Sequence, residues 1–278
     1  MQILGRRVTI SRMYKLRFID SQICDGAMNM AIDEVLTNSM STQSDLIYLR
    51  FYQWQPATLS FGYNQKIEKL IDADAARNAG IDLVRRMSGG KMVFHNIEHT
   101  FSLGLPGAFI EDRIGRGRPF LEIFKFAITP LVDGLIKMGI PARFAASREM
   151  RHSSNNLHCY ATAAGHSIYA EQRKLVGAAG VFRQNTLTIH GSIPIKASFP
   201  PDHIFPGNTK IDHDVEMAAL SDFCTLEKAL ELPRVIADAY SEHLGCELIY
   251  QPINREEFVM AGKIANNKYN NLFWKASD

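Results

Sequence analysis

The chain has 278 residues, of which 46% are hydrophobic, 22% charged and 10% aromatic, and its formal net charge is +2. This composition is typical of a folded globular protein with one large domain or two modest ones. The near-zero charge gives no general attraction to nucleic acid or to a membrane surface, and we expect neither as a partner. No uninterrupted apolar run reaches the ~18 residues that a membrane span needs.

The four cysteines lie far apart and show neither metal-binding spacing nor the pattern of a disulfide framework. In a chain of this length, scattered cysteines are typical of a reducing compartment. The sequence therefore predicts a cytoplasmic protein without a metal site.

The first half of the chain mixes helices and strands. Residues 1–13 precede the first regular pattern and are predicted to form an N-terminal extension. Asp25 is placed to cap a helix over 27–39, and Gln55-Pro56 indicates a hairpin-like connection between two β-rich runs. The other expected elements are strands over 46–54, 57–63, 81–86, 92–95 and 99–105, and a helix over 67–79.

The second half ends in helices. An apolar-faced helix is predicted over 119–139, with a kink at Pro130, and an irregular stretch follows over 141–164. Strands mixed with helices, followed by a helical end, favour an α+β fold over a doubly wound sheet. The remaining elements are strands within 166–171, 173–182 and 186–193, and helices near 214–222, 226–244 and 255–267.

Residues 85–91, Arg-Arg-Met-Ser-Gly-Gly-Lys, form the first segment with chemical potential. Two arginines supply positive charge for a carboxylate or phosphate, and Gly89 and Gly90 let a ligand approach the backbone closely. The alternative is a tight turn between strands with solvated arginines.

Three further positions stand out. Lys174 enters a predicted strand and is followed by the small residues Gly177 and Ala178, which suits a close-packed wall beside an elongated substrate; an exposed strand-end lysine is the simpler interpretation. Cys159 lies in a polar, irregular segment, where a nearby cation would make its thiol nucleophilic. His190 lies at the end of a predicted strand, where a histidine is more often structural than catalytic.

Five segments in a fixed order carry a family resemblance. They are FIDSQICDGAMNMAIDEVL (18–36), ATLSFGYNQ (57–65), RRMSGGKMVFHNIEHTFSL (85–103), RKLVGAAG (173–180) and HGSIPI (190–195). Together with the C-terminal segment 255–274, they cover nearly the whole chain. The sequence resembles the lipoate-protein ligase and octanoyltransferase family.

The resemblance implies a fold and an arrangement of domains. The fold is the biotin/lipoate-protein transferase fold, a mixed β-sheet flanked by helices that is akin to the core of class II aminoacyl-tRNA synthetases. It implies one catalytic domain over 14–278 with a helical C-terminal segment.

The resemblance also implies site residues. In the family, the Arg-Arg-x-Ser/Thr-Gly-Gly segment helps to line the acyl pocket, and one octanoyltransferase class carries a catalytic cysteine fifteen residues before the motif lysine. Cys159 precedes Lys174 by that interval. The implied catalytic residues are Cys159 and Lys174, and the implied substrate-binding residues are Arg85, Arg86, Ser88, Gly89, Gly90, His95, Gly177, Ala178 and His190.

The activity expected from the resemblance is transfer of an octanoyl or lipoyl-type group from acyl-carrier protein, through a thioester on Cys159. The acceptor is a lysine of a lipoyl domain of a 2-oxoacid dehydrogenase or of the glycine-cleavage H protein. Transfer between thioesters is nearly thermoneutral, so neither ATP nor another cofactor is expected. Lys174 would favour the thiolate and relay protons, and backbone N–H groups of 177–180 or of Gly89-Gly90 would hold the oxyanion.

The chain departs from the family pattern in places. The family's usual Gly-Ser-Ala-Gln after the lysine reads Gly177-Ala178-Ala179-Gly180 here, so a hydroxyl and an amide are lost. Met92 stands where alanine is common, and 163–167 lack the usual Pro-Ser-x-Tyr-Glu. Residues 115–118, Gly-Arg-Gly-Arg, look like a biotin-protein ligase motif but lie in the wrong place in the order. We interpret them as a basic loop that could meet an acidic carrier protein.

Other functions stay open at this point. The first is an ATP-dependent lipoate-protein ligase, which forms an acyl-adenylate and would need ATP and Mg²⁺. The second is an octanoyl amidotransferase between lipoyl carrier proteins. The third is a catalytically silent relative that only binds carrier domains. The sequence defines neither the acyl length, nor the acceptor, nor the oligomeric state.

Overall fold

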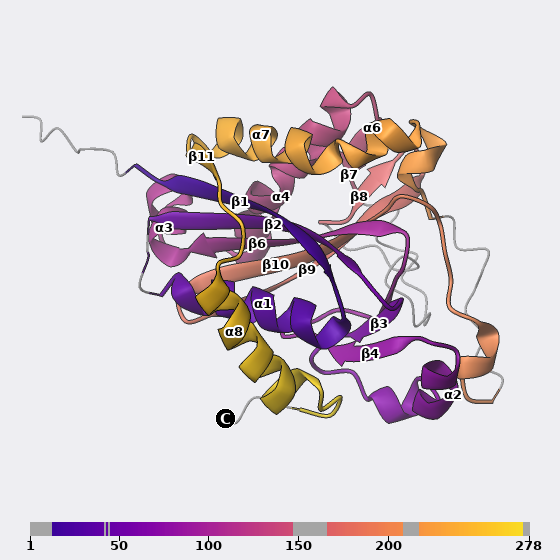
Figure 1. Cartoon of the computed structure of the whole chain (residues 1–278). Coiled ribbons are helices and arrows are strands. Elements are labelled where there is room, and N and C mark those ends of the chain that lie inside the picture. The colour runs from indigo at the N-terminus through magenta and orange to yellow at the C-terminus, as the bar shows by residue number, and fades with distance from the viewer. Residues whose placement is uncertain (1–12, 42, 44, 147–165, 208–216, 275–278) are drawn as a thin grey trace, which may run out of the picture.

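An eight-stranded mixed sheet forms the centre of the molecule (Figure 1). The computed structural model describes residues 13–41, 43, 45–146, 166–207 and 217–274. The strands of the large sheet are β1 (Lys15–Cys24), β2 (Leu46–Trp54), β6 (Glu98–Pro106), β7 (Ala142–Phe144), β8 (Ile168–Ala170), β9 (Arg173–Arg183), β10 (Thr186–Pro194) and β11 (Glu247–Tyr250). They lie in the order β11-β1-β2-β6-β10-β9-β8-β7, with β1 parallel to both of its neighbours and the other pairs antiparallel.

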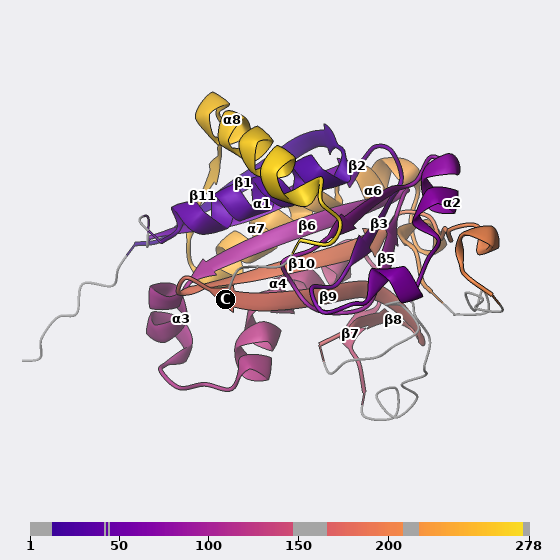
Figure 2. The same ribbon diagram turned by 90° about the horizontal axis from the view of Figure 1, so that it is seen from below.

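Helices cover both faces of this sheet, as Figures 1 and 2 show. The α-helices of the described residues are α1 (Gly26–Ser39), α2 (Ala73–Asn78), α3 (Gly107–Ile114), α4 (Phe120–Lys137), α6 (Leu226–Leu230), α7 (Leu232–Leu244) and α8 (Arg255–Ile264). α1 and α8 pack on one face, and α4 and α7 pack on the other. Within the described residues, no helix is long and apolar enough to cross a membrane.

Strand β2 shows why both faces are covered. Leu49 and Phe51 belong to the core beneath α4 and α7, whereas Tyr48 and Tyr52 belong to the core beneath α1. Successive side chains of a strand point to opposite faces, so a strand with large residues at every position must be buried on both sides. The predicted α+β class with a mixed sheet flanked by helices is therefore confirmed.

A second sheet of three strands lies beside the start of α1. Its strands are β3 (Thr58–Phe61), β4 (Asp82–Arg85) and β5 (Val93–His95), in the order β4-β3-β5. Asp82 ties this small sheet to α1, because its Oδ2 accepts a 2.9 Å hydrogen bond from the backbone N–H of Gly26. Asp25 caps α1, as predicted, by accepting from the backbone N–H of Met28 at 2.7 Å.

The predicted hairpin at Gln55-Pro56 is wrong. β2 pairs with β1 and β6 in the large sheet, whereas β3 pairs with β4 and β5 in the small one. The Gln55-Pro56 peptide is cis and marks the point at which the chain passes from one sheet to the other. Period-2 patterning identifies a strand but does not reveal its partner.

Two predicted helices are also wrong. The helix over 67–79 is a 3-10 turn at Ile67–Lys69 followed by α2, because the Asp72 carboxylate accepts from the first backbone N–H groups of a new helix. In place of a helix near 214–222, the described part of that segment contains only a 3-10 turn at Leu220–Asp222. Sequence patterns did not reveal β1, β11 or α3, and β7 (Ala142–Phe144) lies at the start of the stretch 141–164 that was predicted to be irregular.

Candidate active site

A pocket lies between α1, the small sheet and the large sheet. Tyr52, Thr100, Ser192 and Gly177 are register partners on the adjacent strands β2, β6, β10 and β9, so they form one row across its floor. The pocket encloses about 430 Å³, part of it open to solvent. We call it the chamber, and its walls include Met30, Trp54, Val93, His95, Ala178 and His190.

A second pocket adjoins the chamber along β9. Both pockets are lined by Gly90, Ala178 and Ala179, so the two pockets border each other at these residues, which we call the passage. We call the second pocket the mouth, and its lining also includes Lys174, His166, Ser167, Lys91, Phe120 and Phe124. The predicted lysine therefore lies in the pocket next to a largely apolar chamber, and no acidic residue lines either pocket among the described residues.

The Arg-Arg-x-Ser-Gly-Gly segment connects β4 to β5 and forms one side of this passage. Arg86 lines the chamber, but its guanidinium donates to the Ser60 carbonyl at 2.7 Å and to the carbonyls of Gly89 and Lys91 at 3.1 and 2.9 Å. Arg86 thus holds its own loop in shape. Gly90 has a φ of +93°, a conformation that residues with a side chain rarely adopt.

The close backbone approach predicted for Gly89 and Gly90 occurs within the protein. A Cβ built on Gly62 would lie 2.0 Å from the Gly90 carbonyl oxygen, so Gly62 has to be glycine for the loop to rest on it. Gly89 has open space around its Cα and lines only the mouth. The contact between Gly62 and Gly90 therefore fixes the position of the loop that borders both pockets.

Arg85 lies outside both pockets. It is 3% exposed, and its guanidinium donates to the carbonyls of Tyr63, Gln65 and Leu272 at 2.6, 2.9 and 3.2 Å. Burial lowers the pKa of Arg85. Its contacts join the loop after β3 to the C-terminal segment. Arg85 therefore stabilises the surroundings of the site and does not line it.

His95 lies in a continuous chain of buried polar contacts. Arg86 donates to the Ser60 hydroxyl at 2.6 Å, Ser60 contacts His95 Nε2 at 2.5 Å, and His95 Nδ1 contacts the Glu98 carboxylate at 2.6 Å. Both ring nitrogens are therefore occupied, and the ring stacks on Trp54 with centroids 4.2 Å apart. His95 offers a substrate a flat wall, with no nitrogen left over for proton transfer.

Glu98 closes this chain and joins it to the chamber floor. Its carboxylate accepts from Thr100 and, at 2.5 Å, from Ser192, and Thr100 in turn accepts from Trp54 Nε1 at 2.6 Å. Each of these groups is buried, and a buried polar group is costly unless it is hydrogen-bonded. The polar groups on this side of the chamber wall thus have hydrogen-bond partners within the protein.

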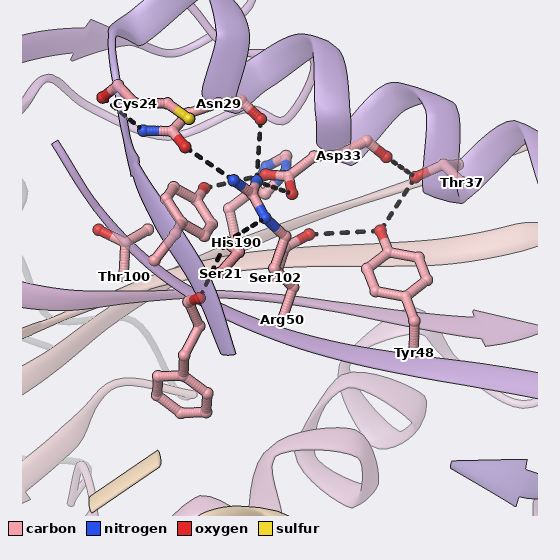
Figure 3. A network of polar contacts seen from close by, with 12 residues as sticks. Ser21, Cys24, Asn29, Asp33, Thr37, Tyr48, Arg50, Thr100, Ser102 and His190 are labelled. Atoms are coloured by element: carbon pink, nitrogen blue, oxygen red, sulfur yellow. Dashed lines mark hydrogen bonds and ion pairs between the residues drawn. The ribbon is translucent and has the colours of Figure 1, made fainter. Parts of the chain in front are cut away.

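A second buried network lies beneath α1 (Figure 3). Arg50 and Asp33 are fully buried and joined at 2.7 Å, and Tyr52 donates to the same carboxylate at 2.9 Å. His190 bonds Ser88 through Nδ1 at 3.0 Å, while its Nε2 lies 3.3 Å from Asp33 Oδ2 without the direction of a hydrogen bond. The predicted site residues Ser88 and His190 therefore join the chamber to a buried ion pair.

Electrostatics favours the charged form of the Asp33 carboxylate. Burial alone would raise the pKa of Asp33, but Arg50 and His190 outweigh it and hold that pKa below its usual value. Burial, helped by Asp33, raises the pKa of Tyr48 to about 12, so its hydroxyl remains a donor or acceptor within the neighbouring group of Thr37 and Ser102. These residues support the floor of the chamber.

Lys174 lies on β9, close to the point where the pairing between β8 and β9 ends. Its backbone pairs with Tyr169 on β8, and its carbonyl accepts from the N–H of Ala218 at 3.0 Å. Only 3% of the residue is exposed, and beyond Val176 β8 no longer accompanies β9. Among the described residues, the segment from Gly177 to Gly180 therefore forms an edge of the sheet toward the mouth.

The structure brings most of the predicted residues together. Gly177, Ala178, Gly90, Arg86, His95 and His190 line the chamber, and Gly89 and Lys174 line the mouth. Ser88 supports His190, and Arg85 lies elsewhere. Cys159 lies outside the described residues.

Several residues at the site were missed from sequence. Asn29 and Asp33 are four apart on the inner face of α1, amid apolar neighbours, and Arg50 is a charged residue inside an apolar strand. Polar residues inside apolar patterns are a signal for buried networks. Trp54 and His166 gave no such signal, because their partners are distant in sequence, and the contact of Glu98 with Ser192 is likewise made across strands. Among the described residues, no group of three or more His, Cys, Asp or Glu could hold a metal ion.

Comparison with solved structures identifies the fold. A lipoate-protein ligase A bound with ATP superposes with a TM-score of 0.75 at 21% identity, covering 94% of this chain and 98% of that one. A putative lipoate protein ligase from T. acidophilum with bound lipoic acid gives 0.72 at 21% identity, covering 92% of this chain and 97% of that one. The chain thus has the fold implied by the sequence resemblance.

Sequence comparison identifies the family. The model of the lipoyl protein ligase A/B catalytic domain matches residues 25–231. Octanoyltransferase LipM of Moorella thermoacetica is 33% identical over 223 residues, covering 77% of this chain and 78% of that protein. The Bacillus anthracis protein of the same name is 26% identical over 272 residues, covering 92% and 96%. The chain therefore belongs to the lipoyl protein ligase A/B catalytic domain family and is an acyltransferase.

Proposed function

We propose that this enzyme transfers an octanoyl group from acyl-carrier protein to a lysine of a lipoyl domain or of the glycine-cleavage H protein, through a thioester on Cys159. The relatives named octanoyltransferase LipM support octanoyl transfer in protein lipoylation. The observation that carries the proposal is that the two pockets border each other. Gly90, Ala178 and Ala179 line both the chamber and the mouth, and Lys174 lines the mouth.

The shape of the site suits a linear acyl chain. The chain lies in the chamber, where each methylene removed from water contributes about 0.8 kcal/mol. Its carbonyl group lies in the passage, beside the small residues Ala178 and Ala179, so that the reacting carbon reaches the mouth. A bulky side chain in the passage would block this placement.

Two acyl-transfer steps follow from this arrangement. The Cys159 thiolate attacks the carrier thioester, a new C–S bond forms, and the carrier C–S bond breaks to release the carrier thiol. The acceptor amine then attacks the acyl-cysteine, and the C–N bond replaces the C–S bond. The Lys174 ammonium favours the Cys159 thiolate in the first step and provides a proton for the departing carrier thiolate. Lys174 then regains a proton from solvent, so that its ammonium is present again in the second step.

A backbone group at the edge of β9 is suited to stabilise the oxyanion. The carbonyl of Ala178 accepts from His166 Nε2 at 3.2 Å, so this residue directs its backbone groups away from β10 and toward the mouth. In an antiparallel strand the N–H and C=O of one residue point to the same side. The Ala178 N–H therefore faces the side on which the tetrahedral intermediate forms.

Intact mass spectrometry tests the proposal. The protein is mixed with octanoyl-acyl-carrier protein without ATP, beside a Cys159→Ser variant. We expect an octanoyl adduct on the wild type alone, and hydroxylamine should remove it because it is a thioester. If no adduct forms, and a lipoyl domain is modified only when ATP, Mg²⁺ and free lipoate are added, the protein is a ligase and the proposal is wrong.

A further inference from the structure

His166 lies at the mouth and is not part of the machinery described above. It lies just before β8 and faces β9, where its Nε2 contacts the Ala178 carbonyl oxygen at 3.2 Å. Its ring packs against Phe124 of α4 with centroids 4.3 Å apart. Because it lines the same pocket as Lys174, it is within reach of a substrate that enters there.

The hydrogen bond to Ala178 defines which nitrogen carries the proton. A carbonyl oxygen only accepts, so Nε2 is the donor and a neutral ring keeps a lone pair on Nδ1. With any residue that the structure describes, Nδ1 makes no hydrogen bond. His95 differs, since both of its nitrogens have partners.

The surroundings of His166 are cationic. Burial lowers its pKa most, and the Lys174 and Lys125 ammonium groups lower that pKa further, against the opposing effect of the Ala178 carbonyl. Lys91 lines the same pocket, and no carboxylate lines it among the described residues. At neutral pH the imidazole is therefore uncharged and able to accept a proton.

We propose that His166 is the general base of the second acyl-transfer step and accepts the proton that the attacking acceptor amine loses on Nδ1. This inference rests on the proposed function. The amine nitrogen forms a bond to the acyl carbon, one N–H proton passes to His166 Nδ1, and the C–S bond breaks with its electron pair on the Cys159 sulfur. An uncharged amine and imidazole thus give an amide, a thiolate and an imidazolium, which releases its proton to solvent.

The charge on Lys174 separates its role from that of His166. The departing thiolate is stabilised by the Lys174 ammonium, which has no lone pair while it does so. The proton of the amine therefore needs another acceptor in the same pocket. The first step needs no such acceptor, because a thiolate attacks without losing a proton.

The substitution His166→Gln separates this role from a structural one. The Gln side-chain amide reaches the position of Nε2 and can still donate to the Ala178 carbonyl, but it accepts no proton at neutral pH. His99→Gln is the control, because His99 likewise has its Nε2 3.0 Å from a backbone carbonyl, that of Ala229, and it is buried and lines neither pocket.

The experiment is single-turnover kinetics by rapid quench and intact mass, with each step measured separately. Wild type, His166→Gln and His99→Gln are first loaded from octanoyl-acyl-carrier protein, and the loss of the adduct is then followed after a lipoyl domain is added, from pH 5.5 to 9. For His166→Gln we expect loading within about threefold of wild type and transfer slowed by about 10²-fold, a typical contribution of general base catalysis.

The pH profile and chemical rescue distinguish proton transfer by His166 from a purely structural role, which would change neither of them. Wild-type transfer should lose rate in acid as the imidazole is protonated, and His166→Gln should lack that limb. Added imidazole should accelerate transfer by His166→Ala. His99→Gln should keep the wild-type rates and pH profile.

Each other outcome overturns the inference. Transfer by His166→Gln at the wild-type rate across this pH range would show that no proton passes to this residue. Equal slowing of loading and transfer would make His166 a positioning residue. A wild type that takes up no octanoyl group would instead overturn the proposed function, and this inference with it.

Discussion

The chamber and the mouth share three residues, yet they are built in opposite ways. In the chamber, charged and polar groups are paired with one another, as in the contacts of Glu98 with Ser192 and of Asp33 with Arg50. In the mouth, a lysine and a histidine lie at a strand edge bordered by small residues, with no acid in the lining among the described residues. The chamber therefore supplies shape, and the mouth supplies reactive groups.

The position of each region in the fold accounts for this difference. The chamber is covered by α1 and by the small sheet, so water is largely excluded and polar groups need protein partners. The mouth lies where β9 continues beyond β8, so main-chain groups and a lysine are presented to a substrate. Substitutions in the chamber should therefore change stability or acyl selectivity, and substitutions in the mouth should change rates.

The largest expected effect is on stability. Asp33→Ala leaves the Arg50 guanidinium fully buried without its carboxylate, and we expect the free energy of unfolding to fall by about 3–5 kcal/mol. The double variant Asp33→Leu with Arg50→Met removes both charges and should recover most of that loss. Urea denaturation measures both. Equal destabilisation of the single and double variants would show that the ion pair is not what holds the region together.

The next effect is on rate. Lys174→Met should slow acyl transfer by about 10²–10⁴-fold, because it removes the group that favours the thiolate and relays protons. Lys174→Arg keeps the charge but does not release a proton readily, so transfer from the acyl-cysteine to the acceptor should survive better than loading. Lys137→Met serves as the control, because Lys137 pairs with Glu242 on the surface. Turnover by Lys174→Met at the wild-type rate would remove the mouth from the mechanism.

A smaller effect concerns acyl length. Val93 lines the chamber, and Val93→Ala should admit longer acyl chains. Each further methylene that is buried should favour the longer substrate by about 0.8 kcal/mol, which is roughly fourfold in the ratio of the two transfer rates. Val84→Ala is the matched control, since Val84 is buried on the neighbouring β4 and does not line the chamber. The measurement is competition between octanoyl and decanoyl carrier proteins. A shift of the same size in both variants would indicate general loosening.

The smallest effect is on the pH dependence of stability. Burial lowers the pKa of His99 in the folded state, so the unfolded chain binds a proton first as pH falls. The contribution of His99 to the free energy of unfolding is fully present above the ordinary histidine pKa of about 6.5. It is lost as the pH falls from there toward the lower pKa that His99 has in the folded protein. Unfolding free energies at pH 7.5 and 5.5 should therefore differ more for wild type than for His99→Gln. An identical difference in the two proteins would contradict this.

Much of the fold was predictable because its signals are local. The Asp25 cap, the apolar face of α4 and the strands that became β6, β9 and β10 were each visible as patterns within one segment. The hairpin at Gln55-Pro56 and the pairing of β1 with β11 were not, because strand partners are chosen by packing across the whole molecule. No sequence pattern indicates that the chain passes from the large sheet to the small sheet at Pro56.

The site shows the same limit. The Arg-Arg segment was recognisable as a loop near the acyl pocket, but only the end of β4 decides that Arg86 faces the chamber and Arg85 faces the C-terminal segment. Glu98 and Asp33 are important through partners on other strands. A motif therefore identified the neighbourhood, and three-dimensional packing determined the role of each residue.

The most direct test of the account is to find where the acyl chain lies. An octanoyl analogue with a photoreactive diazirine at its far end is loaded from acyl-carrier protein, irradiated, and mapped by peptide mass spectrometry. The account predicts labels on Met30, Trp54 or Val93 in the chamber. Labels confined to Phe120 and Phe124 in the mouth, or on Phe258 and Val259 in the separate pocket beside α8, would contradict the division between chamber and mouth.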